Sequence, residues 1–378
     1  YSTLYFHLIK EMNNNNNNDK SIFNTFINIF TSKKDLLINA ANENNFSQIY
    51  CILKDQNRID ETFFKNNDNL EFIIIPSTIT SIGQNSFEYC SELGFVIILS
   101  NLTSIESCTF QGCSSLSKII IPFSVTSIKD YAFNGCFYLT KLVIPPSVTS
   151  IGQGAFKDCI SMKHIFIPSS VKSIEKYTFN HCSSLEKVIL PSSIEKIDDF
   201  AFCGCESLVK IYIPKSVTFI GKAAFSACSS ITQFTIPSSV TTISDMFFSY
   251  CKSLETIIIQ SSVQCIGKYA FNGCSSLKEI IIPNSVISIG ANAFGHCSSL
   301  IKIIIPSSVK SIDKYAFSSC TSLKQISIPS SIPLNEGGYF YECKLLKDIP
   351  ISPSTTVIGE ETFCGCSSLE NFVISSSI

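Results

Sequence analysis

The sequence predicts a right-handed α/β repeat solenoid with a parallel β-sheet and a small helical cap at its N-terminal end. Three observations support this fold class. A cysteine recurs every 23 residues from Cys90 to Cys366 without an insertion or deletion. Each 23-residue unit contains apolar residues two apart, as in a strand that buries one face. Residues 1–70 lack the repeat and show helical spacing of apolar residues instead.

The N-terminal region, residues 1–70, is expected to form its own unit. Asn13 to Asn18 form an Asn run, which is typical of a flexible loop. After this run, Lys33 to Gln56 carries two apolar stripes at helical spacing, Leu36, Leu37, Ala40 and Ala41, then Phe46, Ile49, Ile52 and Leu53. These stripes predict a helix hairpin. It is either a cap over the first repeat, which a repeat array needs, or an ankyrin-like helix pair.

The repeat region, residues 71–378, contains about thirteen units and stops within a unit. With each recurring cysteine as position zero, phenylalanine occupies −3 in all thirteen copies, from Phe87 to Phe363. Positions +6 and +8 are apolar and predict a strand, which a proline at +9 ends in nine copies. The Ala-Phe-x-x-Cys segment predicts a single helical turn with Phe and Cys on one face. Stacked units would bury these residues and pair their strands in parallel.

The unit C-S-S-L-x-x-I-x-I-P-x-S-V-x-S-I-G-x-x-A-F-x-x-C resembles the BspA-type leucine-rich repeat along about 300 of the 378 residues. That resemblance implies a leucine-rich-repeat solenoid. It also implies a surface adhesin or antigen of bacteria or protists that binds a host or matrix protein.

Two places depart from the repeat. Leu99 replaces the proline at +9 in the copy that follows Cys90. Asn335 and Thr355 stand at apolar positions, and Gly337 to Pro353 adds further Gly and Pro residues. We expect a local irregularity around residues 333–355.

The cysteine column raises four interpretations: disulfides, metal ligands, nucleophiles, or packing. Equivalent positions of stacked strands lie about 4.8 Å apart with parallel side chains, whereas a disulfide needs a Cβ separation near 3.8 Å and crossed side chains. A line of thiols does not converge on one metal ion, and His181 and His296 are adjacent in sequence to ladder cysteines but point elsewhere. Buried packing beside phenylalanine is the prediction for the structural ladder, which consists of Cys90, Cys113, Cys136, Cys159, Cys182, Cys205, Cys228, Cys251, Cys274, Cys297, Cys320, Cys343 and Cys366.

The remaining cysteines bear on the cellular compartment. Cys203 and Cys364 occupy position −2, which we expect to face solvent, and exposed unpaired thiols favour a reducing compartment. The resemblance implies the cell surface, so both locations stay open. Glycosylation sequons at Asn45 and Asn101 do not decide between them.

Composition and motifs argue against several classes of function. The net charge is −2 and charged residues make up 15%, which gives no reason to expect a nucleic-acid partner. No apolar run is long enough to span a membrane. Phosphate-loop, serine-hydrolase and zinc-protease motifs are absent, so neither an enzyme nor a cofactor is expected. The chain begins at Tyr1 rather than Met, and we expect it to be a piece of a longer protein.

The outward strand positions +5 and +7 are the candidate partner-binding site. Position +5 carries five basic or potentially basic residues in succession and +7 an apolar column beside them. The candidate residues are Lys118, Ile120, Lys141, Val143, His164, Phe166, Lys187, Ile189, Lys210 and Tyr212. The implied partner is a protein with an acidic surface. The alternative is that β-branched residues pave the sheet and lysines keep it soluble.

Three hypotheses of function follow. The first is an adhesin or surface antigen that uses the sheet face. The second is an intracellular scaffold whose solenoid is a rigid spacer in a larger assembly. The third is a regulatory arm joined to an enzyme outside this segment.

Overall fold

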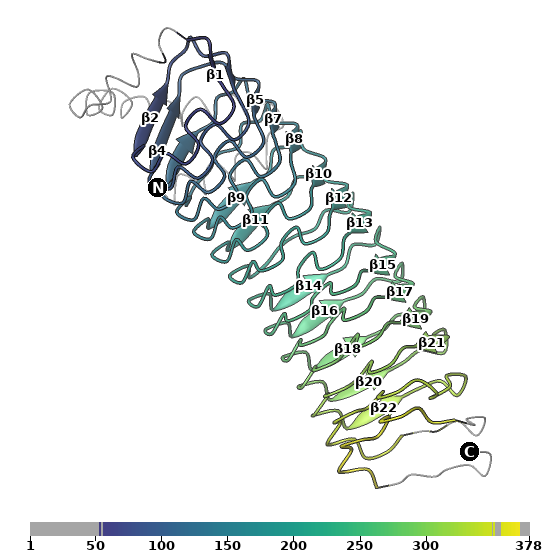
Figure 1. Cartoon of the computed structure of the whole chain (residues 1–378). Helices are drawn as coiled ribbons and strands as arrows, with labels where there is room; N and C mark the ends of the chain where they lie inside the picture. Colours follow the sequence, from purple (N-terminus) through teal and green to yellow (C-terminus); the bar gives the residue numbers. More distant parts are fainter. Residues whose placement is uncertain (1–52, 54–55, 350, 352–356, 371–378) are drawn as a thin grey trace.

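The computed structural model describes residues 53, 56–349, 351 and 357–370, which form an elongated solenoid of stacked coils (Figure 1). Paired strands run parallel, and their partners are 23 residues apart in sequence, as Glu279 and Lys302 are. The right-handed repeat solenoid predicted from the 23-residue period is thereby confirmed. Most coils contribute one strand to each of two rows, and a third side of the coil consists of tight turns. The coils that contain Lys141 and Lys210 have only an isolated bridge in the first row.

The first row of strands contains positions +5 to +7. Its strands lie on one side of the solenoid (Figure 1). They are β2 (Phe72–Ile75), β4 (Phe95–Ile98), β6 (Lys118–Ile120), β9 (His164–Phe166), β11 (Lys187–Ile189), β14 (Gln233–Thr235), β16 (Thr256–Ile258), β18 (Glu279–Ile281), β20 (Lys302–Ile304) and β22 (Gln325–Ser327).

The second row contains positions +14 and +15 and lies on another side of each coil. Its two-residue strands are β1 (Arg58–Ile59), β3 (Ser81–Ile82), β5 (Ser104–Ile105), β7 (Ser127–Ile128), β8 (Ser150–Ile151), β10 (Ser173–Ile174), β12 (Lys196–Ile197), β13 (Phe219–Ile220), β15 (Thr242–Ile243), β17 (Cys265–Ile266), β19 (Ser288–Ile289) and β21 (Ser311–Ile312). In each described strand of this row the isoleucine at +15 is buried.

The turn side of each coil differs from the prediction, because the Ala-Phe-x-x-Cys segment forms turns and not a helical turn. Positions −5 and −1 have positive φ in every copy, as at Tyr269 (56°) and Gly273 (75°), which prevents helical propagation. The backbone N–H groups instead donate to the next coil, and the Phe271 N–H reaches the Ala293 carbonyl at 2.8 Å. The turn side is therefore a third hydrogen-bonded ladder, and the predicted α/β class is corrected here to strands and turns.

The interior contains two continuous columns. The −3 phenylalanine rings stack from Phe64 to Phe363 with centroids 5.1 to 6.1 Å apart. Each ladder cysteine donates its thiol to the carbonyl of a phenylalanine in the preceding coil, at 2.9 to 3.3 Å. Packing beside phenylalanine was expected for these thiols, but the hydrogen bond was not.

The repeat begins before residue 71. Phe64 stacks on Phe87 at 5.1 Å, and Asn67 stands where later coils have the ladder cysteine. The helical cap predicted for residues 1–70 has no support in the described part of that range, where only Leu53 is helical and residues 56–70 form β1 and turns. The Asn run and the rest of the predicted helix hairpin lie outside the described residues.

The predicted irregularity near residues 333–355 is confirmed in the part that the structure describes. Leu334 is buried in place of Asn335, so the coil has shifted by one residue. The Gly359 N–H accordingly donates to the Leu334 carbonyl. Tyr339 occupies position −4, where most other coils have Ala, Ser or Thr, and its hydroxyl donates to the Ile312 carbonyl at 3.0 Å.

Candidate binding face

The outward face of the first row contains the candidate residues, as their spacing predicts. In β11 the side chains of Lys187 and Ile189 are partly exposed, while Val188 between them is buried. The same alternation occurs in β6 and β9. Since successive residues of a strand point to opposite faces, positions +5 and +7 form two parallel columns on this face.

The basic residues at +5 form a row because strand pairing and isolated bridges align their coils. Lys141 bridges to His164, His164 pairs with Lys187, and Lys187 bridges to Lys210. At about 4.8 Å per coil, these four side chains occupy roughly 14 Å of the face. The lysines of this row attract an acidic surface.

Lys118 extends the row toward an aromatic pair that the sequence analysis did not include. Phe72 and Phe95 also occupy +5, and their rings stack at 5.5 Å. The Lys118 Nζ lies 5.4 Å from the centroid of the Phe95 ring, which is a cation–π contact. Because the basic run begins at Lys118, a search for charge alone passes over the two phenylalanines before it.

The apolar column at +7 changes in exposure along the solenoid. Ile120, Phe166 and Ile189 are partly exposed, Val143 is 43% exposed and Tyr212 is 71% exposed. Farther along, Ile281 at the same position reaches 83%. We call the outward residues from Phe95 to Tyr212 the basic face and those from Gln233 to Ser327 the apolar face.

The ladder thiols are not suited to nucleophilic chemistry. They are buried except for the partly buried Cys366, and desolvation by burial raises their pKa, to about 11 in Cys90 and Cys366 and about 12 in Cys297. No described cysteine is in a disulfide. The thiols therefore remain neutral hydrogen-bond donors at ordinary pH.

The expectation that position −2 faces solvent is wrong for several coils. Asn180 and Ser249 are buried there, and the Asn180 amide donates to the Cys203 carbonyl at 3.1 Å. Cys203 itself is only partly exposed, and burial raises its pKa, while Cys364 is exposed. Polar side chains at −2 thus pair with the next coil, so the inference of two exposed thiols holds for Cys364 alone.

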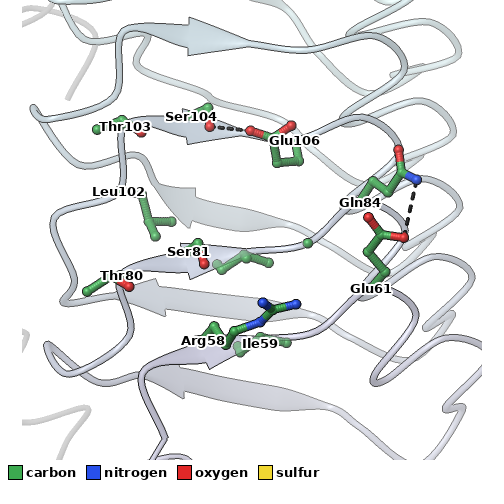
Figure 2. Close-up of a pocket in the computed structure, with 12 residues that line it drawn as sticks. Arg58, Ile59, Glu61, Thr80, Ser81, Gln84, Leu102, Thr103, Ser104 and Glu106 are labelled. Atoms are coloured by element: carbon green, nitrogen blue, oxygen red, sulfur yellow. Dashed lines mark hydrogen bonds between the residues drawn. The ribbon is translucent and has the colours of Figure 1, made fainter.

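A shallow depression of about 300 Å³ lies over the first coils of the second row (Figure 2). Its charged groups contact neighbours within the chain. Arg58 pairs with Asp60 at 2.5 Å, Gln84 donates to Glu61 at 3.4 Å, and Ser104 donates to Glu106. Because these partners already engage the polar groups, the depression has no convergent set of donors for a ligand.

The described residues contain no cluster of three or more His, Cys, Asp or Glu side chains arranged to hold a metal ion. No helix in the described part of the chain is long and apolar enough to cross a membrane.

The chain is similar to known leucine-rich-repeat proteins. The BspA type Leucine rich repeat region matches residues 57–186, 172–300 and 265–378. A solved leucine-rich repeat protein from Bacteroides ovatus is 32% identical over 76% of this chain and 81% of its own, with a TM-score of 0.67. A leucine rich cell surface protein from Faecalibacterium prausnitzii is 29% identical over 83% and 82%, with a TM-score of 0.50. No curated protein sequence matches. The repeat, its geometry and these matches together show that the chain belongs to the BspA-type leucine-rich-repeat family.

Proposed function

We propose that this chain is a non-enzymatic binding protein that holds an acidic protein surface on its basic face. The single observation that carries the proposal is the aligned row of Lys141, His164, Lys187 and Lys210. Beside this row, Val143 and Tyr212 expose apolar surface that a partner can cover. Charge attracts the partner and the apolar column contributes contact area.

The role that we favour is a surface adhesin or antigen. Support comes from family membership and from the similarity to a bacterial cell surface protein. The alternative is an intracellular scaffold, which is favoured by the free thiols of the described cysteines, the exposed Cys364 among them. An antibody against the repeat region, applied to intact and to permeabilised cells that express the full-length gene, separates the two. Labelling only after permeabilisation would exclude the surface role.

The charge of the basic face provides the test of binding. The variant Lys141→Glu/Lys187→Glu/Lys210→Glu reverses three charges in the row, and we expect its affinity for immobilised poly-glutamate to fall by about tenfold or more. The wild-type affinity should also fall with added salt, because exposed charges are screened. Surface plasmon resonance at two salt concentrations measures both effects.

A matched control lies farther along the same solenoid. The variant Lys278→Glu/Lys302→Glu/Lys324→Glu makes the same change in net charge at three exposed lysines, of which Lys302 occupies +5 and the other two occupy +4, directly before the outward strand positions. We expect it to lose much less affinity than the first variant. Equal losses would mean that net charge, and not the aligned row, determines binding. Circular dichroism confirms that both variants keep the fold.

A further inference from the structure

A serine ladder at position +11 begins directly after the coil that contains Asn101. From Ser124 to Ser331 each described copy has serine there. In eight consecutive copies, Ser147 to Ser308, its hydroxyl donates to a carbonyl of the preceding coil, as Ser285 does to Val263 at 2.6 Å. In the coil after Cys90 this position is Asn101, which is exposed. Asn101 therefore stands at a position where the later coils have a hydrogen-bonded serine.

The surroundings of Asn101 show that the whole turn is reshaped. Leu99 replaces proline, so it has a backbone N–H, which donates to the Ile75 carbonyl at 2.9 Å. The adjoining strand β4 is four residues long. The hydroxyls of Ser100 and Ser124 are buried and have no hydrogen-bond partner. Ser124 is the ladder residue of the next coil, so its unsatisfied hydroxyl reflects the loss of alignment at this turn. Unpaired buried hydroxyls carry an energetic cost, which makes this coil less favourable than its neighbours.

From this departure we propose that Asn101 is an acceptor for an N-linked glycan when the chain enters a secretory pathway. Asn101-Leu102-Thr103 is an acceptor sequon, in which a hydroxyl residue two positions on is required. Asn101 and Thr103 are both exposed, while Leu102 between them is buried and anchors the turn. Thr103 lies directly before β5 (Figure 2).

The modification is a glycosyl transfer from a lipid-linked oligosaccharide diphosphate. The Asn101 Nδ2 forms a bond to the anomeric carbon of the first sugar and gives up one proton. The bond from that carbon to the diphosphate oxygen breaks, and the polyisoprenyl diphosphate leaves with the bonding electrons. No oxidation or reduction occurs.

The position of the glycan fits the proposed binding role. The turn at Asn101 connects β4 of the first row to β5 of the second. A glycan there would lie at the edge between the two rows, two coils before Lys141 and therefore away from the aligned row of Lys141, His164, Lys187 and Lys210. This inference rests on the surface role proposed above, since an intracellular chain would not meet the glycosylating enzyme.

The experiment uses the full chain behind an added secretion signal in cultured eukaryotic cells. The variant Asn45→Gln removes the sequon outside the described residues, so that any remaining N-glycan belongs to Asn101. We expect this variant to migrate more slowly on a gel and to lose the shift after treatment with peptide N-glycosidase. Mass spectrometry of the peptide should place the glycan on Asn101.

Two further variants in the same background separate modification from folding. Asn101→Ser restores the residue that the other coils have, and Thr103→Ala removes the hydroxyl of the sequon. Both should be secreted with unchanged circular dichroism and without the shift. A folded, secreted Asn45→Gln chain with an unmodified Asn101 would overturn the inference. Because the added signal imposes secretion, this result does not depend on whether the poly-glutamate test succeeds or fails.

Discussion

The strand side and the turn side of each coil share one core but differ in how much their residues vary from coil to coil. On the strand side, position +7 ranges from Ile120 through Tyr212 to Ser327, and in the coil of Tyr212 the first row is reduced to an isolated bridge at Lys210. On the turn side, phenylalanine at −3 and cysteine at zero hardly vary, and two residues per coil have positive φ. The turn side therefore sets the repeat geometry, and the strand side is free to carry different outward residues.

The largest expected difference between the two sides comes from one truncation on each. Phe271→Ala removes a fully buried ring from the stacked column and should lower the free energy of unfolding by about 3–5 kcal/mol. Ile281→Ala in the same coil removes a side chain that is 83% exposed, and its effect should stay within about 0.5 kcal/mol. Urea unfolding followed by circular dichroism compares them. Similar losses in the two variants would contradict the burial of position −3 and the exposure of position +7.

A second contrast lies within the turn side. Gly112 and Gly135 both occupy position −1, with φ of 70° and 73°. A Cβ at residue 112 would collide with the Tyr89 ring, whereas at residue 135 its closest neighbours would be 3.6 Å away. Gly135→Ala should cost about 1–2 kcal/mol for the left-handed conformation alone. Gly112→Ala should cost about 1 kcal/mol more because the ring must also move.

The double variant Tyr89→Ala/Gly112→Ala checks the origin of that difference. Without the ring, the additional cost of Gly112→Ala should disappear, and the remaining cost should equal that of Gly135→Ala. Thermal or urea unfolding of the four proteins forms a double-mutant cycle. An unchanged cost in the Tyr89→Ala background would mean that the backbone conformation, and not the ring, distinguishes the two glycines.

The same two sides explain which parts of the fold the sequence could predict. Alternation at Ile280 and Ile282 with Pro283 after them identified the strand, because the period of two is a local property of the chain. The helical turn assigned to Ala-Phe-x-x-Cys was wrong, because spacing three is also produced by stacked turns whose hydrogen bonds go to the next coil. Positive φ at residues such as Tyr269 has no clear signal in the residue type. An indirect signal existed, since a large residue at −1, such as Tyr89, His181 or Tyr250, precedes glycine one repeat later.

The candidate binding face also has features that the sequence predicts and features that it does not. The alignment of Lys141 with Lys187 and Lys210 follows from an uninterrupted 23-residue period, so the sequence placed these residues on one face. It did not reveal that Lys118 contacts Phe95, which depends on the side-chain direction across two strands. The thiol hydrogen bonds of the cysteine ladder also depend on where a carbonyl 26 residues earlier points. Residue identity at one position does not contain that information.

The smallest expected effect concerns a single ladder thiol on the turn side. Cys297→Ala removes a buried sulfur and its hydrogen bond to the Phe271 carbonyl, and near pH 8 it should cost about 1 kcal/mol. Burial raises the pKa of Cys297 to about 12 from the ordinary value of 9.0. A raised pKa means that the stabilisation is complete below pH 9 and is lost as the pH rises toward the folded-state value.

Wild type should therefore lose stability relative to Cys297→Ala by about 1.4 kcal/mol for each pH unit above the unfolded-state pKa, and their difference should close near about pH 10. Urea unfolding of both proteins across this pH range measures it. Lysine and tyrosine titrations are common to the two proteins and cancel in the comparison. A difference that stays constant across the range would show that Cys297 ionises equally in the folded and unfolded chains. In that case the thiol ladder would be open to solvent, and position zero of the turn side would be as exposed as the outward positions of the strand side.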